Sequence, residues 1–484
     1  MNGSDKTDLP GERPNILFIL SDDQGAWALG CAGNNEIKTP NLDRLAASGI
    51  RFENFFCTSP VCSPARASLL TGRIPSQHGV HDWIAAGDTT AIYEPEGKGE
   101  LIEYLKDIPG YTDYLAKSGY TCGISGKWHL GDSHHPQKSF DLWEVHAKGG
   151  GPYYGAPMIR EGEVYEEQGY VTDVITDNAL KWLDRQQTAA NPFYLSVHYT
   201  APHSPWQREH HPADLFDYYF NDCPFESVPD GLIAPEWVKY RSINVKDSET
   251  RRVYLSGYYA AVTAMDANVG RLLDWLEKNG KRENTLIFFT SDNGMNMGHH
   301  GVFGKGNATY PLNMFEESVK VPFIISHPKC IKSSGTNSEL LSQYDFMPTL
   351  LEYVGSEVAS AFPLPGRCFN DSLFGKAAAG HEHVVVFDEY GPVRMVRTKS
   401  YKYVHRYKGG PNELYDLEND PGEELNLAGE PRFRSVEKEM KDRLFEWFAV
   451  YVDPAKDGAQ EKVTGSGQLG LCGGDNFLKL RKDL

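Results

Sequence analysis

The chain of 484 residues carries 48 basic and 66 acidic residues, which gives a net charge of −18. This acidic balance argues against a protein that binds along nucleic acid or an anionic membrane surface. Charged residues make up 24% of the chain and hydrophobic residues 40%, so we expect a large folded core. The length favours one large domain with a smaller one attached.

The N-terminal residues and the cysteines indicate the cellular compartment of the protein. The first segment, MNGSDKTDLPGERP, lacks the basic start and the long apolar stretch of a signal peptide, and no run of 18 apolar residues follows it. The eight cysteines are scattered without CxxC pairs, which is typical of free thiols in a reducing compartment. The sequence therefore predicts a cytoplasmic protein that is not inserted in a membrane.

Short apolar runs alternate with amphipathic segments along the first three quarters of the chain. This alternation is typical of an α/β fold, in which helices cover both faces of a large, mostly parallel or mixed sheet. Buried strands are predicted at residues 15–20, 192–199, 285–290 and 321–327. Helices are predicted at residues 41–48, 170–186, 253–280 and 343–355.

The pattern changes near residue 380. Antiparallel strands are predicted at residues 383–390, 393–407 and 412–420, and they precede a helix at 435–452. We therefore divide the chain into an N-terminal domain, residues 1–379, and a C-terminal α+β subdomain with an antiparallel sheet, residues 380–484. A glycine-rich tail ends the second unit.

Two of the predicted strands end alike, in NILFILSDDQG and in TLIFFTSDNGM. Because ligands collect beyond the carboxyl ends of parallel strands, these ends could bring together Asp22, Asp23, Asp292 and Asn293. Carboxylates in one place repel each other unless a cation lies between them, and ligands that are all oxygen favour Ca²⁺ or Mg²⁺ over zinc or copper. The alternative is that each Ser-Asp pair caps a helix or turn.

The segment FFCTSPVCSPARASLLTGR, residues 55–73, places Cys62 between a predicted strand and a predicted helix that Gly72 closes. Arg66 lies four residues further on, on the same helical face. The start of a helix attracts anions and activates a thiol. Cys62 is therefore either a reactive cysteine or a buried structural one.

The segment CSPARASLLTGR resembles the signature of the type I sulfatases in the alkaline phosphatase superfamily, Cys-x-Pro-x-Arg followed by Leu-Thr-Gly-Arg. Other segments resemble this family in order along nearly the whole chain: NILFILSDDQG, GISGKWHLG, YTAPHSP, FFTSDNG, GVFGKGNATY and ELYDLENDPGEELNLA. The resemblance implies an alkaline-phosphatase-like fold and the hydrolysis of sulfate esters, either of a sulfated saccharide or of an aryl or steroid sulfate.

The resemblance also implies cofactors, a partner and residue roles. In this family the signature cysteine becomes Cα-formylglycine, which requires a formylglycine-generating or an anaerobic sulfatase-maturing enzyme. Carried over to this chain, ligation of Ca²⁺, or of Mg²⁺, falls to Asp22, Asp23, Asp292, Asn293 and modified Cys62. Catalytic or sulfate-contacting roles fall to Cys62, Arg66, Lys127, His129, His203 and Lys305.

The chemistry explains why a plain hydroxyl would not serve. A serine that attacked a sulfate ester would be left as a stable sulfate ester. One hydroxyl of a hydrated aldehyde attacks sulfur, and deprotonation of the second hydroxyl then breaks the C–O bond, so that sulfate leaves and the aldehyde returns. His129 is the expected base for this elimination, and His203 with Lys305 is the expected proton donor to the leaving alcohol.

Two alternative functions make different demands on these residues. A phosphonate monoester or phosphodiester hydrolase of the same superfamily would tend to carry Asp-Gln and Asp-His metal pairs, where this chain has Asp22-Asp23 and Asp292-Asn293. A sulfated-glycan binding protein without activity would need neither His129 nor His203. The net negative charge favours small or chain-end sulfated substrates over long polysulfated polymers. The chain is also a candidate homo-oligomer.

The tail after residue 452 has a composition that is typical of a disordered end. Against this, its segment VTGSGQLG, residues 463–470, resembles an ordered loop. Our hypothesis is that the tail folds back over the large domain, or reaches a neighbouring subunit, and forms one wall of the substrate cleft.

Overall fold

The architecture is that of a computed structural model of the whole chain. It describes residues 13–89, 100–241, 243, 245–332, 335–356, 363–376, 380–407, 409–460 and 467–473. The predicted strands at 383–390, 393–407 and 412–420 lie within these ranges, as do residues 453–460 and 467–473 of the tail. The apolar segment 477–480 of the tail lies outside them.

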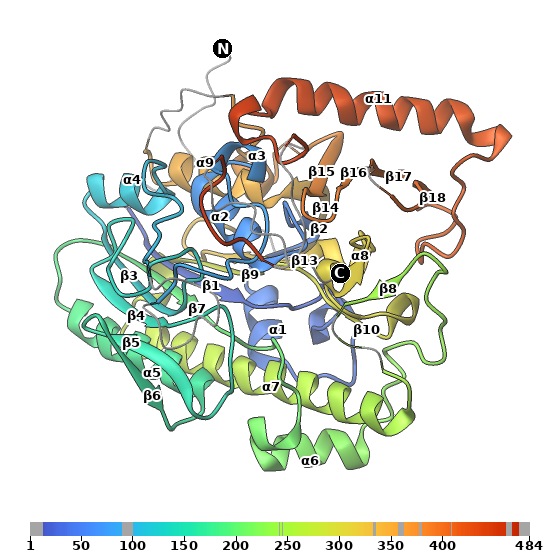
Figure 1. The fold of residues 1–484 in the computed structure, drawn as a ribbon. Coiled ribbons are helices and arrows are strands. Elements are labelled where there is room, and N and C mark those ends of the chain that lie inside the picture. The colour runs from blue at the N-terminus through green and yellow to red at the C-terminus, as the bar shows by residue number, and fades with distance from the viewer. Residues whose placement is uncertain are drawn as a thin grey trace.

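A mixed sheet forms the centre of the large domain (Figure 1). Within the described ranges its strands are, in spatial order, β14 (Gly335–Ser342), β2 (Ile50–Phe56), β13 (Lys320–Ser326), β9 (Thr285–Ser291), β1 (Asn15–Ser21), β7 (Phe193–His198), β3 (Thr121–Lys127), β4 (Leu142–His146), β5 (Ala156–Arg160) and β6 (Glu163–Glu167). The central strands from β9 to β4 run parallel, whereas β13 is antiparallel to both of its neighbours. The predicted mixed and mostly parallel sheet is confirmed.

Helices cover both faces of this sheet because its central strands are apolar on both sides (Figure 1). Alternate residues of β1 enter different cores, with Phe18 on one face and Ile19 on the other. The Ile19 face packs against α1 (Pro40–Ala47), α5 (Val171–Gln186) and α7 (Ser248–Lys278). The Phe18 face packs against α2 (Cys62–Thr71), α4 (Tyr111–Lys117) and α9 (Phe346–Tyr353).

Two helices of the large domain differ from the predicted bounds by more than one residue. Helix α7 begins at Ser248, five residues before the predicted start, because Asp247 caps it by accepting a hydrogen bond from the Thr250 backbone N–H at 2.8 Å. The predicted helix at 343–355 begins as a tighter 3₁₀ turn, Gln343–Asp345, before α9. Apolar periodicity marks the middle of a helix better than its capped first turn.

A second, antiparallel sheet follows, as predicted, but the segment predicted as one strand at 393–407 forms two strands that a bend at residues 399–400 joins. Its strands are β15 (His383–Asp388), β16 (Val393–Thr398), β17 (Tyr401–Arg406) and β18 (Glu413–Asp416). Helix α11 (Arg434–Tyr451) packs on β16 and β17 through Leu444 and Phe448, and it runs along the top of the molecule in Figure 1. The predicted domain boundary follows residue 379. Residues 377–379 lie outside the described ranges, so the boundary stays a prediction.

Buried ion pairs join this sheet to the large domain. Lys402 on β17 has a side chain that is 1% exposed, and its Nζ lies 2.6 Å from Oε1 of Glu423 and 3.3 Å from Oε1 of Glu316. Glu316 begins α8 (Glu316–Val319), which leads directly into β13 of the large sheet. The backbone N–H of Glu316 also donates to Glu423 at 2.7 Å. These contacts fix the C-terminal sheet against the large domain.

Replacement of Lys402 by methionine should lower the free energy of unfolding by about 3–5 kcal/mol, because it takes the ion-pair cation from buried Glu423 and leaves Glu316 with only Arg397 and Lys320. Thermal or denaturant unfolding measures this loss. Lys438→Met is the matched control, because Lys438 is 76% exposed in its ion pair with Asp442 and should cost little. Adding Glu423→Gln to Lys402→Met should restore part of the stability. Equal losses for both lysine variants would contradict the buried network.

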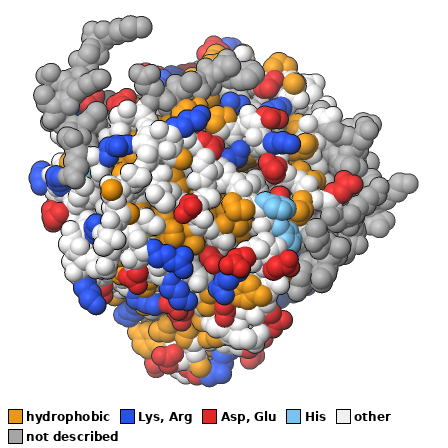
Figure 2. Space-filling model, turned by 90° about the vertical axis from the view of Figure 1, so that its left-hand side faces the viewer, with side chains coloured by type: hydrophobic (Ala, Val, Ile, Leu, Met, Phe, Trp, Pro, Cys, Tyr) orange, Lys and Arg blue, Asp and Glu red, His pale blue; other side chains and the backbone are white. Residues whose placement is uncertain are grey.

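The surface agrees with the mixed composition of the chain. Figure 2 shows basic and acidic side chains interspersed over the face that it presents, with apolar side chains between them. No helix in the described ranges combines the length and the apolar character needed to cross a membrane.

Candidate active site

The ends of β1 and β9 bring the predicted acidic residues together. These strands are parallel neighbours with Ser21 opposite Ser291, so the residues that follow them leave the sheet at the same edge. Both Asp22 and Asp292 are fully buried. Asp292 Oδ1 accepts from the Asp23 backbone N–H at 3.1 Å, and Asn293 Nδ2 donates to Asp23 Oδ1 at 2.8 Å. The two strand ends therefore form one cluster.

Each carboxylate of this cluster contacts a cation that a different part of the chain supplies. Lys127, the last residue of β3, places its Nζ 2.5 Å from Asp22 Oδ2. Arg66 of α2 donates from Nε to Asp292 Oδ2 at 2.8 Å. Lys305 places its Nζ 2.7 Å from Asp23 Oδ1. The structure thus brings together the predicted acidic and basic site residues.

The three carboxyl groups of the cluster differ in their pKa values. Burial raises the pKa of Asp22 well above its usual range, and repulsion by Asp292 adds to this. Burial also opposes ionisation of Asp292 and Asp23, yet the cations around them hold both pKa values below the ordinary value; Arg66 contributes most for Asp292, and Lys305 for Asp23. A further positive charge between these groups would therefore relieve the repulsion at Asp22.

Cys62 lies at the first turn of α2, as predicted, and is 4% exposed. The helix ends at Gly72, whose φ of 65° is left-handed, a conformation that glycine adopts without strain. Burial alone would lower the pKa of Lys305, but the charge of Asp23 raises it above its ordinary value. Arg66 follows Cys62 by one helical turn, so the thiol lies on the same face of α2 as this cation.

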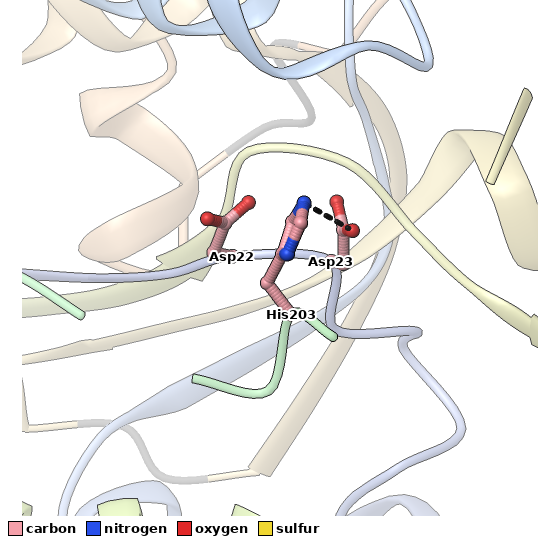
Figure 3. Close-up of side chains that lie close together, drawn as sticks. All are labelled: Asp22, Asp23 and His203. Atoms are coloured by element: carbon pink, nitrogen blue, oxygen red, sulfur yellow. Dashed lines mark ion pairs between the residues drawn. The ribbon is translucent and has the colours of Figure 1, made fainter. Parts of the chain in front are cut away.

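The cluster offers oxygen atoms as ligands for a metal ion. Among the described residues, Asp22 Oδ1 and Asn293 Oδ1 are buried and have no hydrogen-bond partner. Asp22, Asp23 and His203 offer ligand atoms that all lie within 4.8 Å of one another. Figure 3 shows the His203 ring between the two carboxylates. Buried carboxylate and amide oxygens without donors fit a hard cation such as Ca²⁺ or Mg²⁺.

His203 follows β7 in a loop and contacts the cluster from the side. Its Nδ1 donates to the Ser204 carbonyl at 2.8 Å, and its Nε2 lies 3.6 Å from Asp23 Oδ2. Burial lowers the pKa of His203 to about 4. The sequence predicts a catalytic role for His203 near the leaving group, and the structure places it within reach of the carboxylates of the cluster as well.

His129 is held in one tautomer. Its Nε2 lies 3.1 Å from the Ile84 carbonyl, which can only accept, so this nitrogen carries the proton. Its Nδ1 is buried and has no hydrogen-bond partner in the described part of the chain. Burial lowers the pKa of His129 to about 3. The ring is therefore neutral and has one nitrogen free to accept a proton.

Sequence reasoning missed the residues that support the two histidines. A methyl group on Gly149 would lie 2.1 Å from the His129 ring, and one on Gly150 would lie 3.1 Å from the His203 ring. The glycine run 149–151 was the available signal, because glycine permits such close approach. Ser63, next to Cys62, donates from Oγ to the His129 carbonyl at 3.0 Å.

Comparison with known proteins identifies the family. The Sulfatase model matches residues 14–356, and a model described as N-sulphoglucosamine sulphohydrolase, C-terminal, matches residues 298–449. The chain therefore belongs to the sulfatase family, and the predicted resemblance is confirmed. It is a sulfuric ester hydrolase of the alkaline phosphatase superfamily, so the alternative of a binding protein without activity is wrong.

Similar proteins span nearly the whole chain. An N-acetylglucosamine-6-O-sulfatase of Bacteroides thetaiotaomicron is 31% identical, over 92% of this chain and 88% of the relative. An ulvan-active sulfatase of Formosa agariphila is 30% identical, over 92% of this chain and 83% of the relative. A solved structure in complex with its substrate D-glucosamine-2-N,6-O-disulfate is 28% identical, covers 93% of this chain and 100% of that chain, and has a TM-score of 0.74.

Proposed function

We propose that this sulfatase removes sulfate from small or chain-end sulfated saccharides, with a formylglycine made from Cys62 as nucleophile. The observation that carries the proposal is the position of Cys62 in the first turn of the buried helix α2, one turn before Arg66, whose Nε donates to Asp292 Oδ2 of the cluster at 2.8 Å. The saccharide is supported by the names of the relatives, which include an N-acetylglucosamine-6-O-sulfatase and an ulvan-active sulfatase. An aryl or steroid sulfate is the second choice.

The proposed metal is Ca²⁺, with Mg²⁺ as the alternative, because the donors are oxygens. The residues that would hold it are Asp22, Asp23, Asp292, Asn293 and modified Cys62. Sulfatases of this family typically use formylglycine and a metal. When bound, such an ion polarises a sulfate oxygen and favours ionisation of the attacking hydroxyl.

Side chains of this protein stabilise the transferred group and move the protons. Arg66, Lys127 and Lys305 offset the negative charge of the sulfuryl group during transfer. His203, with Lys305, delivers the proton to the leaving alcohol, and this proton comes from the charged Nζ of Lys305, because His203 is neutral and carries its own proton on Nδ1. His129 accepts the proton of the second hydroxyl of residue 62 at its free Nδ1, while its Nε2–H stays on Ile84. Loss of that proton expels sulfate and restores the aldehyde.

The proposal also names a partner and a compartment. A formylglycine-generating or an anaerobic sulfatase-maturing enzyme would modify Cys62 before activity appears. We propose a cytoplasmic site of action, supported by the cysteine pattern of the sequence. Mass spectrometry of the peptide around Cys62, from protein made in its native source, tests the modification. An unmodified thiol in all molecules would overturn the proposed nucleophile.

A change at His203 should separate the proposed substrates. His203→Ala should lower kcat/KM by about 10²-fold or more on a 6-O-sulfated N-acetylhexosamine, whose alcohol is a poor leaving group and needs a proton. The loss should be much smaller on a nitrophenyl sulfate, whose leaving group departs without one. Sulfate release measured on both substrates gives the comparison. His135→Ala, at a side chain that is 68% exposed, is the control. Equal losses on both substrates would contradict the donor role.

A further inference from the structure

The described part of the tail, residues 467–473, folds back onto the loop 79–85 of the large domain. The Gln468 backbone N–H donates to the Trp83 carbonyl at 2.8 Å, and the Ala85 N–H donates to the Gln468 carbonyl at 2.9 Å. These two bonds form a short parallel bridge that pairs Ile84 with Gln468. The tail is therefore joined to a loop that is nearly 400 residues away in the sequence.

The side chain of Gln468 reinforces this bridge. It is completely buried, and its Oε1 accepts from the His81 backbone N–H at 2.8 Å. Its Nε2 donates to the Gly79 carbonyl at 2.9 Å and to the Gly470 carbonyl at 2.9 Å. Both ends of the amide are thus used to hold backbone groups. Because buried polar groups are costly to leave unpaired, these bonds fix the conformation of the loop.

Ile84 connects this loop to the active site. Its neighbours Trp83 and Ala85 bind the tail, whereas its own carbonyl accepts from His129 Nε2 at 3.1 Å. Its N–H donates to Ser63 Oγ at 3.1 Å, and Ser63 in turn donates to the His129 carbonyl. Backbone groups of one residue therefore hold both the ring and the main chain of His129. Ser63 lies directly next to Cys62.

We propose that Gln468 is a positioning residue for His129. By fixing Ile84, it keeps the Nε2–H of His129 on a carbonyl and leaves Nδ1 free to accept a proton. The inference rests on the proposed function of His129 as the base of the elimination step. In that step Nδ1 takes the proton of the free hydroxyl at residue 62, the O–H electron pair forms the C=O bond, and the C–O bond to sulfate breaks with its electrons on sulfate.

The test is Gln468→Ala in the matured enzyme. Displacement of a catalytic group by about 1 Å can cost on the order of 10²-fold, so we expect kcat to fall between about 10-fold and 100-fold. Because the slowed step follows sulfuryl transfer, residue 62 should accumulate as its sulfate ester. Rapid quenching during turnover of nitrophenyl sulfate, followed by peptide mass spectrometry, detects this ester. A purely structural role would lower the active fraction without this accumulation.

Two further variants control for the fold of the tail. Leu471→Ala changes the same segment at a side chain that is 51% exposed, and its kcat should equal that of the wild type. Gln468→Glu keeps an acceptor for the His81 N–H but removes the donors to Gly79 and Gly470, and it should accumulate the ester to a smaller extent. Gln468→Glu decides the outcome if Gln468→Ala does not fold, and wild-type behaviour of Gln468→Glu would then overturn the proposal.

The variant His129→Ala tests the role of His129 as the base separately from the positioning role of Gln468. If His129→Ala turns over slowly without accumulating the sulfate ester, the proposed role of His129 as the base is wrong. If it accumulates the ester and Gln468→Ala does not, the role of His129 stands and the positioning role of Gln468 is overturned. The double variant should lose no more activity than His129→Ala alone, whereas additive losses would show that Gln468 acts independently of His129.

Discussion

Replacement of Cys62 by alanine should abolish multiple turnover, with a loss in kcat on the order of 10⁴-fold to 10⁶-fold, because it removes the proposed nucleophile. Cys62→Ser should lose nearly as much for a different reason. A serine hydroxyl can attack sulfur once, but the ester that it forms has no second hydroxyl whose deprotonation would expel sulfate. Steady-state release of sulfate from nitrophenyl sulfate measures both losses.

The serine variant should also form a product that can be detected. Its residue 62 should carry a stable sulfate ester after incubation with substrate, which peptide mass spectrometry detects, whereas the alanine variant should carry none. Cys31→Ser, at a half-buried cysteine outside the site, is the matched control and should keep full activity. Near-normal multiple turnover by either Cys62 variant would show that residue 62 is not the nucleophile.

The central sheet and the acidic cluster could be predicted because both follow from local patterns. Apolar runs that are buried on both faces indicate parallel strands, and the repeated Ser-Asp endings place Asp22 and Asp292 at the same edge once β1 and β9 are adjacent. The signature around Cys62 specified a helix start, and α2 begins at Cys62 itself. The helix start and each strand lie next to the residues that predict them, whereas the meeting of Asp22 with Asp292 also depends on the rule that the carboxyl ends of parallel strands share one edge of the sheet.

The supporting contacts of His129 could not be predicted in this way. They depend on backbone groups, which any residue carries, and on approaches between distant segments. The carbonyl of Ile84 has no signature in the sequence, and Gln468 lies in a segment whose composition suggests disorder. The glycines at 149 and 150 were visible, but glycine also marks ordinary turns. Only the fold shows which ring they face.

Removal of the metal should lower kcat by at least about 10³-fold, the loss that one charge-stabilising group can cause in a hydrolase, and added Ca²⁺ or Mg²⁺ should restore it. Stability gives a second readout that does not depend on activity. A ligand at 100 times its Kd stabilises the folded state by about 2.7 kcal/mol, so the chelated enzyme should gain Tm when Ca²⁺ is added. Asp22→Ala and Asp292→Ala should show neither the recovery nor the gain.

The control for this experiment is a buried carboxylate outside the cluster. Asp266 on α7 is 1% exposed and accepts hydrogen bonds from the Asn41 and Leu42 backbone N–H groups at the start of α1. Asp266→Ala should therefore lower Tm and yet keep the full gain on addition of Ca²⁺, because only the strand-end oxygens would bind the ion. Full activity of the metal-free enzyme, or an unchanged Ca²⁺ response in Asp22→Ala, would show that the unpaired oxygens of Asp22 and Asn293 do not bind a cation.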